Sequence, residues 1–126
     1  MSMPSATLRP HERIKDPRDF RRAFDQKRSA ADAALVVYGA PNGLAYPRLG
    51  ISVGRKKVRR AVARNRIKRL VREAFRLSKG ELPAGVDLVV VPRTAELTFA
   101  VARRALPRLA QAVARRLGLH PAKAGP

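Results

Sequence analysis

Residues 55–77 read RKKVRRAVARNRIKRLVREAFRL, and from Arg55 to Arg72 this stretch contains ten lysines and arginines and no acidic residue. On a helical wheel, at about 100° per residue, its apolar side chains gather on one arc. They are Ala63, Ile67, Leu70, Val71, Ala74 and Phe75. The remaining arc carries Asn65, Arg66, Lys68, Arg69, Arg72 and Arg76. This pattern predicts an amphipathic helix from about residue 60 to residue 77, with one face in a core and the other cationic.

The cationic face of this helix repels itself unless a partner neutralises it. Like charges three and four residues apart destabilise a helix by a few tenths of a kcal/mol per pair, and only Glu73 relieves that repulsion from within the stretch. Solvated helix faces usually mix both signs of charge. A polyanionic partner therefore explains the pattern better than the alternative, a face that only keeps the protein in solution.

Size and composition narrow the class of protein. The chain has 126 residues, 45% of them hydrophobic, with a net charge of +19 and no cysteine. One domain with one core is expected at this length, and the charge favours nucleic acid or an anionic membrane as partner. No apolar run approaches the roughly 18 residues of a membrane span, and no signal-peptide pattern is seen. The absence of cysteine excludes disulfides and thiolate metal sites, so a cytoplasmic location is expected.

Turn and capping signals predict the order helix, strands, helix, strand, helix. The first helix is expected from its N-cap Asp16 to about Lys27,. Strands are predicted at residues 33–40, 48–54 and 86–91, with residues 27–30 left open as a further pairing segment,.

A last helix is expected from Thr98 to a stop at Gly118, kinked or split in two at Pro107,. The fold class is then α+β, a two-layer sandwich in which the second and third helices pack on one sheet. The domain boundaries follow: a flexible arm at residues 1–12, a single domain at 13–118 and a flexible tail at 119–126.

Two features leave alternatives open. Phe20 and Phe24 share a face of the first helix, either as core residues or as a partly exposed platform on which bases stack,. One face of the strand at 48–54 carries only Gly50, Ser52 and Gly54. That face either leaves room for a ligand or is covered by bulky side chains from another segment.

No catalytic constellation is visible in the sequence. The nine acidic residues are dispersed, without a spaced pair for two metal ions, and both histidines, His11 and His120, lie in the expected flexible ends,. Phosphate-loop, nucleophile-elbow and zinc-ligand spacings are also missing. The residues indicate a nucleic-acid-binding protein without an active site of its own. RNA is favoured over DNA because the cationic helix follows a strand and a basic loop rather than a helix-turn-helix connection.

The central stretch resembles the signature of the bacterial ribonuclease P protein component, through Arg64-Asn65-Arg66 continued as IKRLVREAF. Residues 47–53 (PRLGISV) and 56–61 (KKVRRA) resemble that family's third strand and basic loop. Residues 13–24, with two phenylalanines, resemble its first helix. The similarity covers about residues 9–117. By this resemblance the fold is αβββαβα, a ribosomal-protein-like sandwich with a left-handed strand–helix–strand crossover.

The resemblance also implies a function and its site residues. In this family a large RNA subunit cleaves precursor tRNA endonucleolytically with Mg²⁺, and the protein, without catalytic residues or a cofactor of its own, binds both the RNA subunit and the 5′ leader. The expected protein is a cytoplasmic monomer without membrane contact, and metal positions on it are not assigned. The residues expected to face the RNA subunit are Lys56, Lys57, Arg59, Arg60, Arg64, Asn65, Arg66, Lys68, Arg69 and Arg72. The residues expected to line the leader cleft are Phe20, Phe24, Val36, Tyr38 and Ser52.

Two other classes of protein share some of these features. A ribosomal or other structural RNA-binding protein would have the same charge and sheet but would support no tRNA cleavage. A protein-only nuclease would cleave RNA unaided, but it would need the paired carboxylates that the sequence lacks.

Overall fold

The computed structural model describes residues 8–119, and its elements follow the predicted order αβββαβα. The helices are α1 (Pro17–Asp25), α2 (Ala61–Leu77) and α3 (Phe99–Arg116), with short 3-10 turns η1 (Pro10–Glu12) and η2 (Lys79–Glu81). The strands are β1 (Ser29–Ala31), β2 (Leu35–Pro41), β3 (Arg48–Ile51) and β4 (Val86–Pro92).

The four strands form one mixed sheet in the order β1-β2-β4-β3. β1 pairs antiparallel with β2, and β2 pairs antiparallel with β4. β3 runs parallel to β4, and the chain between them passes through α2. The predicted strand–helix–strand connection through the cationic helix is therefore confirmed, and the segment left open at residues 27–30 does pair, as β1. The left-handedness of the crossover stays a prediction.

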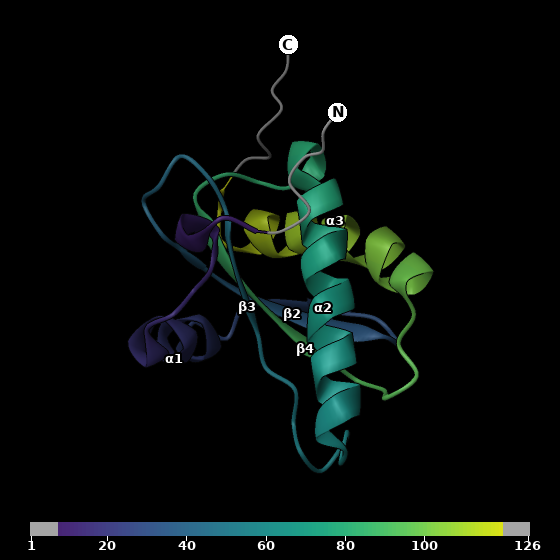
Figure 1. Cartoon of the computed structure of the whole chain (residues 1–126). Coiled ribbons are helices and arrows are strands. Elements are labelled where there is room, and N and C mark those ends of the chain that lie inside the picture. Colours follow the sequence, from purple (N-terminus) through teal and green to yellow (C-terminus); the bar gives the residue numbers. More distant parts are fainter. Residues whose placement is uncertain (1–7, 120–126) are drawn as a thin grey trace.

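The two faces of the sheet have different covers. α2 and α3 pack on one face and form the main core with Leu35, Val37, Leu88 and Val90. α1 packs on the other face, where Ala23 meets a smaller cluster of sheet residues. In Figure 1 α2 runs from top to bottom of the view, α1 lies to its left, and α3 crosses behind it. The apolar arc predicted for residues 60–77 is the face that α2 buries.

Gly39 allows α3 to approach the sheet closely. A Cβ at this position would lie 2.4 Å from Val113 Cγ1 on α3, which is far inside contact distance. The strand therefore has no side chain where the helix crosses it. The end of α3 is also fixed by glycine, because Gly118 has φ 78° and the Leu119 N–H donates to the Ala114 carbonyl at 2.8 Å,.

The first helix begins as predicted. The Asp16 carboxylate accepts from the Arg18 backbone N–H at 2.9 Å and also binds the Arg18 guanidinium. These hydrogen bonds, the guanidinium first, lower the pKa of Asp16 to about 2. The helix ends at Asp25 rather than near Lys27, and Lys27 itself takes a left-handed conformation with φ 56°.

Three expectations about the ends and elements are wrong. The flexible arm predicted at residues 1–12 does not extend over residues 8–12, because Leu8 is 5% exposed in the core and Glu12 forms an ion pair with Lys79 at 2.7 Å. The last helix is not split at Pro107: α3 continues across the proline, because buried neighbours on both sides outweigh the hydrogen bond that its missing N–H cannot donate, and a kink there stays a prediction,. The strand predicted at 48–54 ends at Ile51.

The remaining predicted boundary, the flexible tail at residues 119–126, falls at the end of the described residues. Leu119 packs against the core, while residues 1–7 and 120–126 lie outside the described residues, with His120 among them. Within residues 8–119, none of the helices has the length and apolar character that crossing a membrane requires.

We expect Gly39→Ala to destabilise the fold by about 1–3 kcal/mol, because the added methyl overlaps Val113,. Gly80→Ala is the matched control, since a Cβ there meets nothing within 4 Å. Urea unfolding followed by circular dichroism measures both variants. Equal stability of the two would contradict the close packing of α3 on β2.

Candidate nucleic-acid interface

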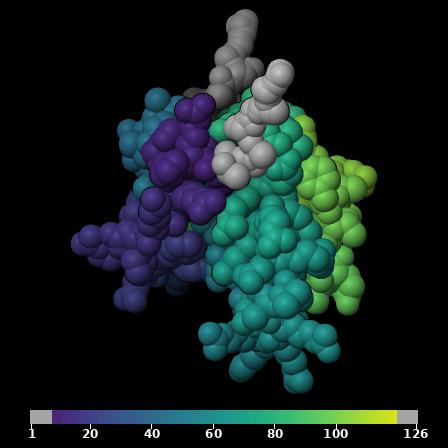
Figure 2. All heavy atoms as spheres, in the orientation of Figure 1, coloured from purple at the N-terminus to yellow at the C-terminus, as the bar shows by residue number. Residues whose placement is uncertain are grey.

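The loop that precedes α2 directs its cations into solvent. Lys56, Lys57, Arg59 and Arg60 are exposed, whereas Val58 between them is 1% exposed and anchors the loop in the core. In Figure 2 the atoms of this loop and of the start of α2 project from the lower end of the molecule. We call the cations of the loop and of the outer face of α2, within residues 55–72, the cationic ridge.

The cationic ridge is not neutralised by acids. Within residues 8–119, no lysine or arginine between positions 55 and 72 forms an ion pair. Asn65, Arg66 and Arg69 are exposed, while Arg64, Lys68 and Arg72 are half-buried. The positive charge of the ridge is therefore available to attract a polyanion. The ten residues predicted to face RNA all lie on the basic loop or on α2.

Two ridge arginines also hold the local structure. Arg64 Nη1 donates to the carbonyls of Val58 and Arg59 at 3.0 and 2.9 Å, which closes the basic loop onto α2. Arg66 donates to the carbonyls of Leu97 and Ala95 at 3.1 and 2.8 Å, which ties the segment before α3 to α2. These bonds satisfy the guanidinium groups without cancelling their charge.

Arg13 is a candidate binding residue that the sequence analysis missed. It lies beside β3 through a bridge to Leu49, and its Nε is buried without a hydrogen-bond partner among residues 8–119. Burial, followed by the charges of Arg13 and Arg69, lowers the pKa of Arg72, which shows how closely the cations are crowded. Two hollows meet at Arg13 and Arg72, one toward Phe20 and one toward Phe99. An orphaned guanidinium donor between two hollows fits an anionic ligand.

Phe20 covers one of the three small residues of the 48–54 face, whereas a Cβ on Gly54 would meet nothing within 4 Å. A Cβ on Gly50 would lie 2.7 Å from two ring atoms of Phe20, so the ring lies directly against the glycine. At Gly50 the small face is therefore covered by a bulky side chain. The same ring also lines a hollow of about 210 Å³ together with Arg13, Lys68 and Arg72.

The other predicted leader residues share the α1 side of the sheet. Phe24 is 36% exposed and meets Tyr38 edge-on, with ring centroids 4.8 Å apart. Val36 alternates with Tyr38 along β2 and faces the same side, and Ser52 continues the pairing beyond β3 through a 3.0 Å bond from its N–H to the Val90 carbonyl,. All five residues thus lie on one side, although only Phe20 lines the hollow beside Arg72.

A buried carboxylate fixes α1 over this side of the sheet. Asp87 is 0% exposed; its Oδ1 accepts from Arg48 Nε at 2.8 Å and from Asn42 Nδ2 at 3.0 Å. Its Oδ2 accepts from Arg48 Nη2 at 2.7 Å and from Arg22 of α1 at 3.1 Å. Arg48 Nη2 also contacts Asp19 of α1 at 3.3 Å. Removing one partner from such a network leaves a buried charge unpaired, which is strongly destabilising.

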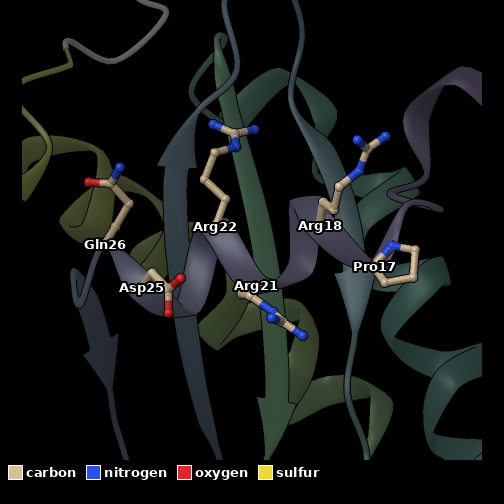
Figure 3. Close-up of a pocket in the computed structure, with 6 residues that line it drawn as sticks. All are labelled: Pro17, Arg18, Arg21, Arg22, Asp25 and Gln26. Atoms are coloured by element: carbon tan, nitrogen blue, oxygen red, sulfur yellow. The ribbon is translucent and has the colours of Figure 1, made fainter.

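The outer face of α1 carries a further shallow hollow lined by arginines. Figure 3 shows that Arg21 and Arg22 leave the helix in opposite directions. Arg22 reaches the buried Asp87, and Arg18 is held by Asp16 at 2.8 Å. Two of the three arginines at this hollow therefore have structural partners, unlike those of the cationic ridge.

The acidic residues are less dispersed in space than in the sequence. Asp19 on α1 and Asp87 on β4 lie far apart in the sequence, but both contact Arg48. Both oxygens of Asp87 accept from arginine or asparagine side chains, so the two carboxylates balance the charges of Arg22 and Arg48. Within residues 8–119, no group of three or more histidine, aspartate or glutamate side chains is placed to hold a metal ion.

Comparisons with known proteins agree with this geometry. The ribonuclease P family model matches residues 8–114. The chain belongs to the ribonuclease P protein family. The ribonuclease P protein component of Methylococcus capsulatus is 46% identical to this chain over 98 residues, which cover 76% of each chain. That of Photorhabdus laumondii is 42% identical over 99 residues, which cover 77% of this chain and 82% of the relative. The solved ribonuclease P protein of Thermotoga maritima superposes with a TM-score of 0.71 at 40% identity, over 79% of this chain and 96% of that one.

Membership of the ribonuclease P protein family confirms the recognition made from Arg64-Asn65-Arg66 and the surrounding motif. It also confirms the α+β fold class, since the solved structures that match are ribonuclease P proteins. The family name connects the chain to tRNA processing within a ribonucleoprotein. The individual contacts of the ridge and of the α1 side stay predictions.

Proposed function

We propose that this chain is the protein subunit of ribonuclease P, which binds the catalytic RNA subunit through the cationic ridge and the 5′ leader of precursor tRNA on the α1 side of the sheet. One observation carries the proposal. The domain has an acid-free ridge along α2 and an aromatic pair, Phe24 and Tyr38, on the opposite side of the sheet. One small body can therefore contact two RNA molecules at once.

The physical role follows from charge. The RNA subunit and the precursor are both polyanions, and a +19 protein between them reduces their repulsion,. Mg²⁺ would supply the hydrolytic chemistry in the RNA subunit. The protein contributes affinity: ridge cations neutralise phosphates, and the rings of Phe24 and Tyr38 stack with unpaired leader bases,. Because the mature product lacks the leader, the second contact favours substrate over product.

A 5′-processing assay at low Mg²⁺ tests the proposed function against its alternatives. We expect the protein to accelerate leader removal only when the ribonuclease P RNA is present, because the charge it contributes replaces screening by Mg²⁺. Cleavage by the protein alone would identify a protein-only nuclease. A protein that binds RNA but does not affect processing would fit a structural RNA-binding protein instead.

For the ridge, we expect Arg69→Ala to reduce the slope of log affinity for the RNA subunit against log salt by about one, as each lost phosphate contact does. Arg69 is chosen because it is exposed and, unlike Arg66, is not bonded to backbone carbonyls, so mainly charge is lost. Arg103→Ala is the control, since that arginine is paired with Glu81 at 2.9 Å. An unchanged slope for Arg69→Ala would show that the RNA subunit binds another surface of the protein.

For the leader, we expect Phe24→Ala to narrow the affinity ratio of precursor over mature tRNA by about fivefold or more, the size of one lost base–aromatic stack. Both affinities are measured with the assembled holoenzyme. Leu44→Ala is the matched control, because Leu44 and Phe24 are both 36% exposed but Leu44 lies in the loop after β2. An equal loss of affinity for precursor and mature tRNA would show that the leader does not bind this surface.

A further inference from the structure

An apolar hollow with a cationic rim lies between α2 and the start of α3. Its volume is about 700 Å³. The apolar lining consists of Leu8, Leu70 and Phe99, and the polar lining consists of Arg13, Arg66, Arg69, Arg72 and Glu73. A hollow of this size and mixed lining is typical of small-ligand sites, which combine an apolar floor with a few polar groups.

The position of Phe99 is set by the cationic helix itself. Arg66 binds the carbonyls of Ala95 and Leu97, and Leu97 is 2% exposed, so the segment that leads into α3 is held against α2. Phe99 follows directly as the first residue of α3 and stays 39% exposed. A large aromatic ring is thus kept partly exposed beside the ridge, where it can contact a ligand in the hollow.

The charges around the hollow favour an anion that also has an apolar face. Four guanidinium groups line it, and the one carboxylate, that of Glu73, is bound by Arg76 through Nε at 3.1 Å and through Nη2. The buried Nε of Arg13 still lacks an acceptor among the described residues. Free phosphate would satisfy the arginines but would leave the apolar floor open. A nucleotide satisfies both, because its base stacks on aromatic and guanidinium planes while its phosphate accepts from arginine.

We propose that this hollow receives one unstacked nucleotide of the ribonuclease P RNA subunit, with its base against Phe99 and its phosphate on Arg13, Arg69 and Arg72. The inference rests on the proposed binding of the RNA subunit by α2. It adds a base contact to a surface that would otherwise hold phosphates only. The hollow adjoins the one that Phe20 lines at Arg13 and Arg72, but its other lining residues come from α2 and from Phe99 of α3, so we assign it to the RNA subunit rather than to the leader.

The first experiment is an NMR titration of the full chain with adenosine 5′-monophosphate and with ribose 5-phosphate. We expect the nucleotide to shift the ring signals of Phe99 and to bind at least about fivefold more tightly than the sugar phosphate. Equal affinities would show an anion site without base recognition and would overturn the proposal. A Phe99 signal that responds to deletion of residues 1–7 but not to the nucleotide would assign the hollow to the chain's own N-terminus, with the same consequence.

The second experiment measures affinity for the whole RNA subunit. Phe99→Ala and Phe99→Leu should each weaken it by about fivefold or more, whereas Val101→Ala, which removes a 37% exposed side chain outside the hollow, should not,. Phe99→Leu keeps the apolar bulk, so a loss in that variant reports the ring rather than folding. If Arg69→Ala weakens binding and the Phe99 variants do not, the nucleotide site is wrong and the proposed function stands. If none of them weakens binding, the proposed function itself fails.

Discussion

The position of α1 on the sheet depends on one buried carboxylate. Asp87 on the central strand β4 accepts hydrogen bonds from Arg48 on β3, from Arg22 on α1 and from Asn42 after β2. Four segments distant in sequence are thereby fixed around a charge that cannot be left unpaired. Because α1 is held in this way, Phe20 rests on Gly50 and Phe24 meets Tyr38. The positions of both phenylalanine side chains therefore depend on the buried network of Asp87.

The distribution of acids divides the cations into a paired and an unpaired group. Arg22, Arg48 and Arg76 are paired with carboxylates, and so are the α3 arginines Arg103 and Arg108. Among the residues that the structure describes, the cationic ridge has no such partners, and Arg64 and Arg66 are oriented by backbone carbonyls instead. Carbonyl groups fix the direction of a guanidinium while leaving its full charge, so the ridge is ordered and still attractive to phosphate.

Most of the fold could be predicted because local patterns and tertiary structure agree. The helical period of residues 60–77 and the alternation along β2 place the same side chains in the core that the structure buries. The failures share a long-range cause. Core packing keeps α3 continuous across Pro107, a bridge to Leu49 places Arg13 beside β3, and Asp19 and Asp87 meet through Arg48. Hydrophobic periodicity in the sequence does not predict long-range contacts of this kind. The ridge, in contrast, could be predicted from its charge and from the resemblance to a known family.

The edge strands at the two margins of the sheet determine whether copies of the protein can pair through their backbones. β3 lies at one margin, where the Ile14 N–H donates to the Leu49 carbonyl at 2.9 Å and residues 13–14 cover part of the strand. β1 lies at the other, is three residues long, and has the Ser29 carbonyl bound by Arg116. Within residues 8–119, neither margin presents a long run of unpaired backbone, so the domain offers little template for strand exchange or fibre growth. Edge-to-edge pairing of two copies is therefore disfavoured at both margins of the sheet.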